Sequence, residues 1–407
     1  METQVNVINP DDALNLVKTI LAFDRSIAEF EANENVIFAG GNDLPKLIHS
    51  IKNKAVEDCD KAALCFYPEC DKRSIKNSHT IQESSSLKQT AESGHLISPT
   101  GRTEKDSWIG KIGYHKASVF PGFCTFHENI FQEFEAQKDF KDERQIGLQL
   151  FRTICREISV NQEVKRSLLK WLDVYVGFRN QKLDERFYSE LAKLGLDKNS
   201  AGIISSSYKF DNGIVRYLKK YLLSTRKYLR TLYRLKSAAF NDIKQGKEER
   251  FFCHAVVIDT EIPVCLAGRG GIGVKYGAGV QKLNLIINVL PLQGKTYLVA
   301  GSFHKHKKHI EKYFERYIGS PFNLLTLVES WMLYGSDHWF LKPSVWEALD
   351  DIHRQKIFNE LYRSQKNIVA FPEIMIFKGL RLEIIKKYKG LGPEHSIIAG
   401  QLEALMN

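Results

Sequence analysis

The sequence predicts a multidomain α+β protein, with helices through most of the first 250 residues and an antiparallel sheet with helices in the remainder. Apolar residues recur at helical spacing between residues 138 and 250, and the period changes to two after residue 250. Two close pairs of potential metal ligands lie earlier, between residues 61 and 136. The length of 407 residues exceeds one ordinary core, so two or three domains are expected.

The expected parts follow one another along the chain. An acidic helical region (1–60) precedes a zinc-binding module (61–136), a basic helical region (137–250) and a C-terminal α+β domain (251–407). In the C-terminal domain, alternating apolar residues predict strands in FFCHAVVID, EIPVCLAG, LNLIINVLP and KTYLVAGS. We expect helices to return between residues 306 and 365, and a short strand, IVAFPEIMIF, to follow them.

Two glycine-rich or polar segments are expected to be turns and loops. Residues 268–273 (GRGGIG) are followed by a strand-like segment rather than a helix, so β-turns or a hairpin bulge explain them better than a nucleotide-binding loop. Residues 98–110 (SPTGRTEKDSWIG) are expected to form a polar loop inside the zinc-binding module.

Charge is distributed unevenly along the chain, whose net charge is +10. Residues 1–60 hold 5 Lys/Arg against 11 Asp/Glu, a net of −6, whereas residues 211–250 hold 11 against 4, a net of +7. We expect the basic region to bind a polyanionic partner, namely nucleic acid, and we expect DNA rather than RNA. The alternative is a solvated helix face that docks on the acidic N-terminal region. The candidate phosphate contacts are Lys219, Lys220, Arg226, Lys227, Arg230 and Arg234.

The long basic helix, expected over residues 211–244, also carries an apolar and aromatic stripe. Tyr221, Tyr228 and Tyr233 are interleaved with the basic residues and, at this spacing, are expected to pack in the core rather than to stack on bases.

Cysteine use and hydropathy indicate a soluble cytoplasmic protein with no membrane partner. No segment approaches the roughly 18 apolar residues of a membrane span. The start of the chain, METQVNVINPDDAL, lacks the basic and apolar regions of a secretory signal. Seven scattered cysteines, an odd number, favour reduced thiols and metal ligation over a disulfide framework.

Two ligand pairs predict a structural zinc ion. Cys65 and Cys70 stand in a turn between strand-like segments, and Cys124 and His127 stand at the start of a helix. Zinc takes four thiolate or imidazole ligands in a tetrahedron, and the two pairs supply these four ligands. The order of zinc knuckle, β-hairpin and ligand-bearing helix is that of a treble clef. Buried apolar cysteines with a surface histidine are the alternative, and Cys59 is a substitute ligand.

Ser78-His79-Thr80-Ile81 lies between the two ligand pairs. A segment with a histidine at the end of a strand, inside a hairpin held by zinc, resembles the HNH, or ββα-metal, endonuclease family. The resemblance covers residues 61–136 only. It implies that His79 is the general base of a phosphodiester hydrolysis assisted by Mg²⁺ or Mn²⁺. Asn129 matches the family's helical Asn or His position, and His115 is a further catalytic candidate. Ser78 stands where the family has an acidic metal ligand.

Two functions are therefore expected as alternatives. The first is nucleic-acid binding with HNH-like, metal-dependent endonuclease activity. Bacterial proteins that join an HNH-like module to other domains often act in antiviral defence, so the resemblance implies that role. The second is a non-catalytic, zinc-stabilised interaction or sensing module, in which the C-terminal domain recognises a protein partner.

Overall fold

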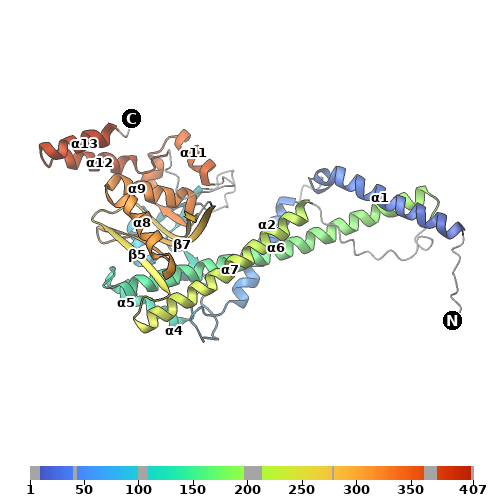
Figure 1. The fold of residues 1–407 in the computed structure, drawn as a ribbon, viewed down its shortest axis with the longest axis horizontal. Coiled ribbons are helices and arrows are strands. Elements are labelled where there is room, and N and C mark those ends of the chain that lie inside the picture. The colour runs from blue at the N-terminus through green and yellow to red at the C-terminus, as the bar shows by residue number, and fades with distance from the viewer. Residues whose placement is uncertain are drawn as a thin grey trace. The chain divides into compact units, whose positions relative to one another are not determined.

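The computed structural model describes residues 10–39, 44–99, 109–196, 213–276, 279–361 and 374–404. It combines long helices with antiparallel sheets (Figure 1), which confirms the α+β class. The chain divides into two compact units, one drawn from residues 1–61 and 161–228 and the other from residues 62–160 and 229–407. The units do not follow the order of the chain, because the two longest interior helices each begin in one unit and end in the other.

The first unit is helical. It contains α1 (Pro10–Ala39), α2 (Leu44–Ala62), the later part of α6 (Glu143–Lys193) and the earlier part of α7 (Gly213–Gln245). Leu168 of α6 packs against Leu218 and Leu222 of α7, and Phe187 of α6 packs with Ala22 of α1. Buried apolar residues at helical spacing therefore hold this unit together.

A seven-stranded antiparallel sheet forms the centre of the second unit, with the order β3-β2-β9-β6-β7-β8-β5. Its strands are β2 (His95–Pro99), β3 (Ile109–Gly113), β5 (Phe251–Ile258), β6 (Val264–Tyr276), β7 (Gly279–Leu292), β8 (Lys295–Phe303) and β9 (Trp339–Leu341). The β7–β8 hairpin turns through Gln293 and Gly294, both with positive φ (47° and 83°), as a tight two-residue hairpin requires.

Helices follow β8, and several of them pack on this sheet and close the core. The helices are η3 (His304–His306), α8 (Lys307–Ile318), α9 (Pro321–Ser330), η4 (Trp331–Gly335), α10 (Pro343–Glu347), α11 (Asp351–Leu361), α12 (Lys378–Lys389) and α13 (Pro393–Ala404), of which α13 packs on α9 and α12. Trp331 and Trp339 are fully buried among strand residues such as Leu285 and Leu298. Ser320 caps α9, because its side chain accepts a hydrogen bond from the Phe322 N–H.

The expectation of turns at residues 268–273 is wrong, because these residues continue through the middle of β6. Close packing explains Gly268 instead. A β-carbon there would collide with the Ser336 side chain, whereas one on Gly271 would chiefly meet the flexible end of Lys282. A glycine inside a strand often marks such a close approach.

The segment between the two ligand pairs also differs from the sequence expectation. Part of the expected loop at 98–110 belongs to strands, since β2 extends to Pro99 and β3 begins at Ile109. This hairpin pairs with β9 through Ile97 and Leu341 and so extends the C-terminal sheet. The expected strand at 368–377 lies partly outside the described residues. Its described part, residues 374–377, is a turn before α12.

Short elements surround the predicted metal ligands. They are β1 (Ser78–His79), η1 (Glu83–Leu87), α3 (Lys88–Thr90), β4 (Val119–Phe120), α4 (Thr125–Glu128), η2 (Asn129–Phe131) and α5 (Gln132–Gln137). β1 and β4 pair antiparallel, with His79 opposite Val119.

A buried ion pair beneath α12 leads to a stability prediction. Arg381 donates two hydrogen bonds of 2.7 Å to Glu329, whose carboxylate also accepts from the Phe377 N–H, and both side chains are at most 3% exposed. Arg381→Leu leaves a buried carboxylate without its cation, so we expect it to lower the free energy of unfolding by about 3–5 kcal/mol. Chemical denaturation followed by tryptophan fluorescence measures this change.

The exposed pair between Lys389 and Glu403 is the matched control, since its nitrogen and oxygen also lie 2.7 Å apart. Lys389→Leu is expected to cost less than about 1 kcal/mol, because water screens exposed pairs. Equal effects of the two leucine substitutions would contradict the assignment of the buried pair as a stabilising contact.

Candidate metal centre and the groups around it

The four predicted metal ligands come from two loops that fold onto each other. Cys65 follows α2, and its N–H donates to the Lys72 carbonyl, while the Cys70 N–H donates to the Tyr67 carbonyl. The turn between them includes Glu69 at φ 64°, which reverses the chain. Cys124 immediately precedes α4, whose first turn carries His127.

The structure brings these four side chains into one cluster, with all ligand atoms within 4.8 Å of one another. The Cys65 Sγ to His127 Nδ1 distance is 3.5 Å, Cys124 Sγ to His127 Nδ1 is 3.4 Å, and Cys70 Sγ to Cys124 Sγ is 3.9 Å. Bonds of about 2.3 Å to sulfur and about 2.0 Å to nitrogen give a tetrahedron with edges of roughly 3.5–3.8 Å. The cluster can therefore hold a metal ion such as zinc. Cys59 is not part of it.

Burial and local hydrogen bonds shift the pKa values of the groups in the cluster. Burial raises the pKa of Cys65 to about 12. Burial also opposes ionisation of Cys124, but hydrogen bonds, including one with the His127 backbone, lower its pKa overall. Burial, and then Lys72, lower the pKa of His127, which keeps the imidazole neutral and its Nδ1 lone pair available. A divalent cation would offset the cost of ionising the buried thiols.

Aromatic packing fixes the His127 ring and anchors the cysteine turn. Tyr67 stacks on His127 with ring centroids 3.8 Å apart and an interplanar angle of 8°. Phe240 of α7 meets Tyr67 edge-on, and Lys236 of the same helix donates a 3.1 Å hydrogen bond to the Phe66 carbonyl. The Cys/His cluster is therefore tied to the later part of α7.

His79 occupies a half-buried position beside a carboxylate. Its Nδ1 lies 3.1 Å from the Ala117 carbonyl and its Nε2 lies 3.1 Å from Glu83 Oε2. Burial lowers the pKa of His79, and Glu83 opposes that effect. A neutral ring that donates from Nδ1 to Ala117 presents its Nε2 lone pair to the carboxylate. Two facing acceptors of this kind attract a proton, a water molecule or a cation.

Asn129 and His115 lie on exposed segments near this hairpin. Asn129 begins η2, and His115 lies in the turn after β3 with its ring against Tyr114. Within the described ranges, His79 has hydrogen-bonding partners in Ala117 and Glu83 and none in Asn129 or His115. The Cys/His cluster is also the one group of three or more His, Cys, Asp or Glu side chains in that part of the chain that could share an ion.

A buried arginine links the ligand helix to α6, and sequence reasoning missed it. Arg152 is fully buried and pairs with Glu128 and Glu135, while Glu128 also accepts a 2.8 Å hydrogen bond from Ser78. Ser78 therefore has a carboxylate partner on α4. The sequence showed that Glu128 follows the predicted ligand His127 directly. It did not show that Glu128 pairs with Arg152, which lies 24 positions further along the chain.

The six predicted basic residues of α7 are all exposed. Four of them, Lys219, Lys220, Arg226 and Lys227, belong to the first unit, and the remaining two, Arg230 and Arg234, belong to the second. Arg234 lies over the Phe303 ring at 5.9 Å.

The expectation that Tyr221 and Tyr233 pack in the core is wrong. These side chains are 47% and 40% exposed. The buried residues of α7 up to residue 235 are instead Val215, Leu218, Leu222, Thr225, Leu229, Leu232 and Leu235. These residues are three or four positions apart, which keeps one side of the helix on the core and leaves both tyrosines outside it.

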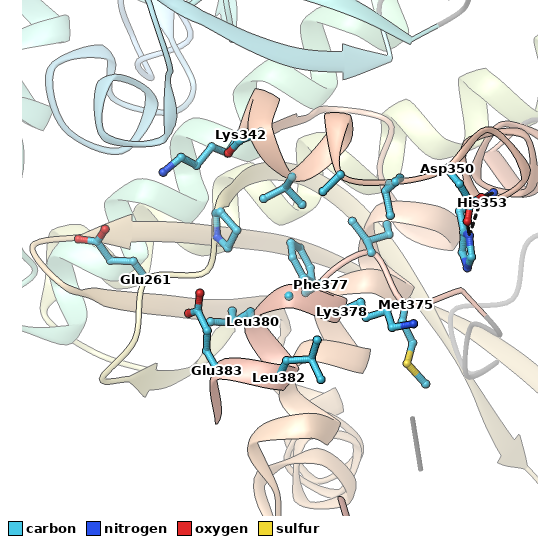
Figure 2. Close-up of a pocket in the computed structure, with 17 residues that line it drawn as sticks. Glu261, Lys342, Asp350, His353, Met375, Phe377, Lys378, Leu380, Leu382 and Glu383 are labelled. Carbon is cyan, nitrogen blue, oxygen red and sulfur yellow. Dashed lines mark hydrogen bonds and ion pairs between the residues drawn. The ribbon is translucent and has the colours of Figure 1, made fainter. Parts of the chain in front are cut away.

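A cavity of about 610 Å³ opens beside α10 and α12 in the second unit. Figure 2 shows Phe377 and Leu380 in its middle, Glu261 and Lys342 at one side, and the hydrogen-bonded Asp350 and His353 at the other. Its volume suits a small molecule. No sequence pattern indicated it, because its lining comes from segments far apart in the chain.

A comparison of the chain with family models, curated proteins and solved structures finds no match. Among the described residues, none of the helices has both the length and the apolar character needed to cross a bilayer.

Proposed function

We propose that this chain is a nucleic-acid-binding protein stabilised by a structural zinc ion, with its binding surface on α7. One observation carries the proposal. Between Gly213 and Tyr228, α7 has five basic residues and no acidic residue, and all five basic side chains are exposed. They are Arg216, Lys219, Lys220, Arg226 and Lys227.

Such a surface suits phosphate groups. The buried side of this helix is apolar and contacts α6 through Leu218 and Leu222, so the cations project from the remaining surface. Phosphate contacts release counterions, and binding to the surface is therefore expected to weaken steeply as salt is added. DNA is the expected ligand before RNA.

The zinc ion is assigned a structural role. Three thiolates and one imidazole complete a tetrahedron and leave no coordination position for water or substrate. Cys65, Cys70, Cys124 and His127 would clamp the cysteine turn to α4, with β1 and β4 between them. This order of knuckle, hairpin and helix supports a treble clef of the HNH type.

The finer proposal is hydrolysis of a phosphodiester at His79. Its Nδ1 contact with the Ala117 carbonyl supports it, because that hydrogen bond orients Nε2 as the acceptor of a proton from water. Glu83, whose carboxylate lies 3.1 Å from His79 Nε2, would hold a divalent ion such as Mg²⁺ or Mn²⁺. When bound, that ion would neutralise charge developing on the phosphate. Asn129 and His115 remain candidates for a supporting role.

His79→Ala tests this proposal. We expect metal-dependent cleavage of a plasmid or oligonucleotide to fall by about 10²–10⁴-fold, the usual loss for a general base. Because burial lowers the pKa of His79, the wild-type rate should decline only as the pH falls below the ordinary histidine value of about 6.5. Cleavage rates measured against pH, with zinc content measured in parallel, check both expectations.

His95→Ala is the control, since this histidine is exposed at the start of β2 and its Nδ1 lies 2.8 Å from the Ser93 carbonyl in the adjoining turn. Undiminished cleavage by His79→Ala would exclude the catalytic assignment. Loss of zinc from that variant would make His79 a structural residue instead.

The cavity favours a second candidate function, a zinc-stabilised sensing module without catalysis. Its apolar centre and its charged edge of Lys342, Glu261 and Glu383 could recognise a small molecule. In this alternative, the C-terminal part of the chain recognises its partner, and neither His79 nor the basic residues of α7 are required.

A further inference from the structure

We infer that the basic surface of α7 binds single-stranded rather than duplex nucleic acid, with Tyr217 and Tyr221 as stacking platforms for bases. This inference rests on the proposed nucleic-acid binding and names the form of the ligand.

The two tyrosines form an exposed pair. Tyr217 is 66% exposed and Tyr221 is 47% exposed, and their ring centroids lie 6.3 Å apart at an interplanar angle of 41°. They are four residues apart, so they occupy neighbouring positions on the same side of the helix. Leaving two aromatic side chains in water forfeits the apolar burial that a core position would give them.

An exposed basic residue adjoins each tyrosine in the sequence of α7. Arg216 precedes Tyr217 and Lys220 precedes Tyr221, and both basic side chains are exposed. Leu223, 64% exposed, adds an apolar contact nearby. Surfaces that bind single strands combine these features, since cations follow the phosphates while aromatic rings stack on successive bases.

Tyr217 and Tyr221 could not stack on the bases of a duplex in the same way. In a duplex the base faces are covered by their neighbours, and side chains reach only base edges and phosphates. A tyrosine platform can stack only on a base that is already free of its neighbours, as in a single strand or a loop. The exposed rings therefore favour a ligand with accessible bases.

An anionic membrane surface would also attract a basic helix, but the packing of α7 argues against it. A helix that lies on a membrane buries its apolar side in the lipid. The apolar side of α7 already packs on α6, where Leu218 and Leu222 contact Leu168. What remains exposed is mainly cationic, with the tyrosine pair and Leu223 as its apolar part.

Fluorescence anisotropy with the full chain tests the inference. The probes are a labelled single strand of about 20 nucleotides, in DNA and RNA forms, and a duplex of the same length, at low salt. We expect the single strands to bind more tightly than the duplex. The double variant Tyr217→Ala/Tyr221→Ala should bind them at least about 30-fold more weakly, because each stacked base contributes roughly 1–3 kcal/mol. Duplex binding should change less than about threefold.

The conservative variant Tyr217→Phe/Tyr221→Phe keeps the rings and should retain wild-type affinity, and circular dichroism checks that the helix is intact in both variants. Preference for the duplex, or equal weakening of both ligands by the alanine variant, would overturn the inference while leaving nucleic-acid binding supported. Absence of binding to every oligonucleotide would overturn the proposed function together with the inference. Binding to vesicles of anionic lipid in place of oligonucleotides would do the same.

Discussion

Replacing Lys219, Lys220, Arg226 and Lys227 together by glutamate is expected to abolish nucleic-acid binding. The change removes four cations from an exposed surface and adds four anions, which then repel phosphates. We expect affinity at low salt to fall by at least about 10²–10³-fold, and the dependence of wild-type binding on the logarithm of the salt concentration to disappear with it. Anisotropy titrations at several salt concentrations measure both effects.

A variant with the same change of net charge elsewhere provides the control. Lys52 and Lys54 of α2 and Lys386 and Lys387 of α12 are exposed, and their joint replacement by glutamate should weaken binding far less. If the two quadruple variants behave alike, general charge rather than the surface of α7 is responsible. Binding that survives the change on α7 would show that this surface is not the site.

Cys124→Ser is expected to release the metal ion and to unfold the segment around it. Cys124 lies next to both Cys70 and His127 in the cluster, and three ligands hold zinc much less tightly than four. Metal-binding energy is folding energy in such sites, and zinc-finger peptides gain about 10–16 kcal/mol from it. We expect a loss of several kcal/mol, seen as faster amide hydrogen exchange in residues 62–99 and 109–137.

Acidification should have the same effect without a mutation, because protons compete with the ion for the thiolates and the imidazole. Cys155→Ala is the control for the mutation, since Cys155 is fully buried on α6 and lies outside the cluster. That variant should keep its metal. Full metal content in Cys124→Ser would contradict the ligand assignment.

The sequence was most informative where the signal is local. The long basic helix was expected over residues 211–244 and is observed as Gly213–Gln245, because its buried residues repeat every three or four positions. The clustering of Cys65, Cys70, Cys124 and His127 could be predicted because each pair is close in sequence and its spacing suits a tetrahedral site.

Long-range pairing could not be predicted in the same way. β9 has only three residues and lies within a segment with helical periodicity, yet it joins β2 to β6 and so completes the sheet. The position of Arg152 depends on carboxylates contributed by two other helices. Such contacts depend on the tertiary arrangement, which no local pattern encodes.

The exposure of Tyr221 also escaped the sequence pattern. It precedes the buried Leu222 by one residue, so a stripe drawn by residue type includes both. The helix turns by about 100° per residue, however, and only one of two adjacent residues can face the core fully. The same rotation that buries Leu222 leaves Tyr221 on the surface beside Tyr217.

The central claim is that Cys65, Cys70, Cys124 and His127 bind one zinc ion, and native mass spectrometry with elemental analysis tests it most directly. Protein purified without chelators is expected to carry one zinc per chain, and X-ray absorption should show three sulfur ligands and one nitrogen ligand. Protein that is folded and free of zinc, or zinc held by a different ligand set, would contradict the claim.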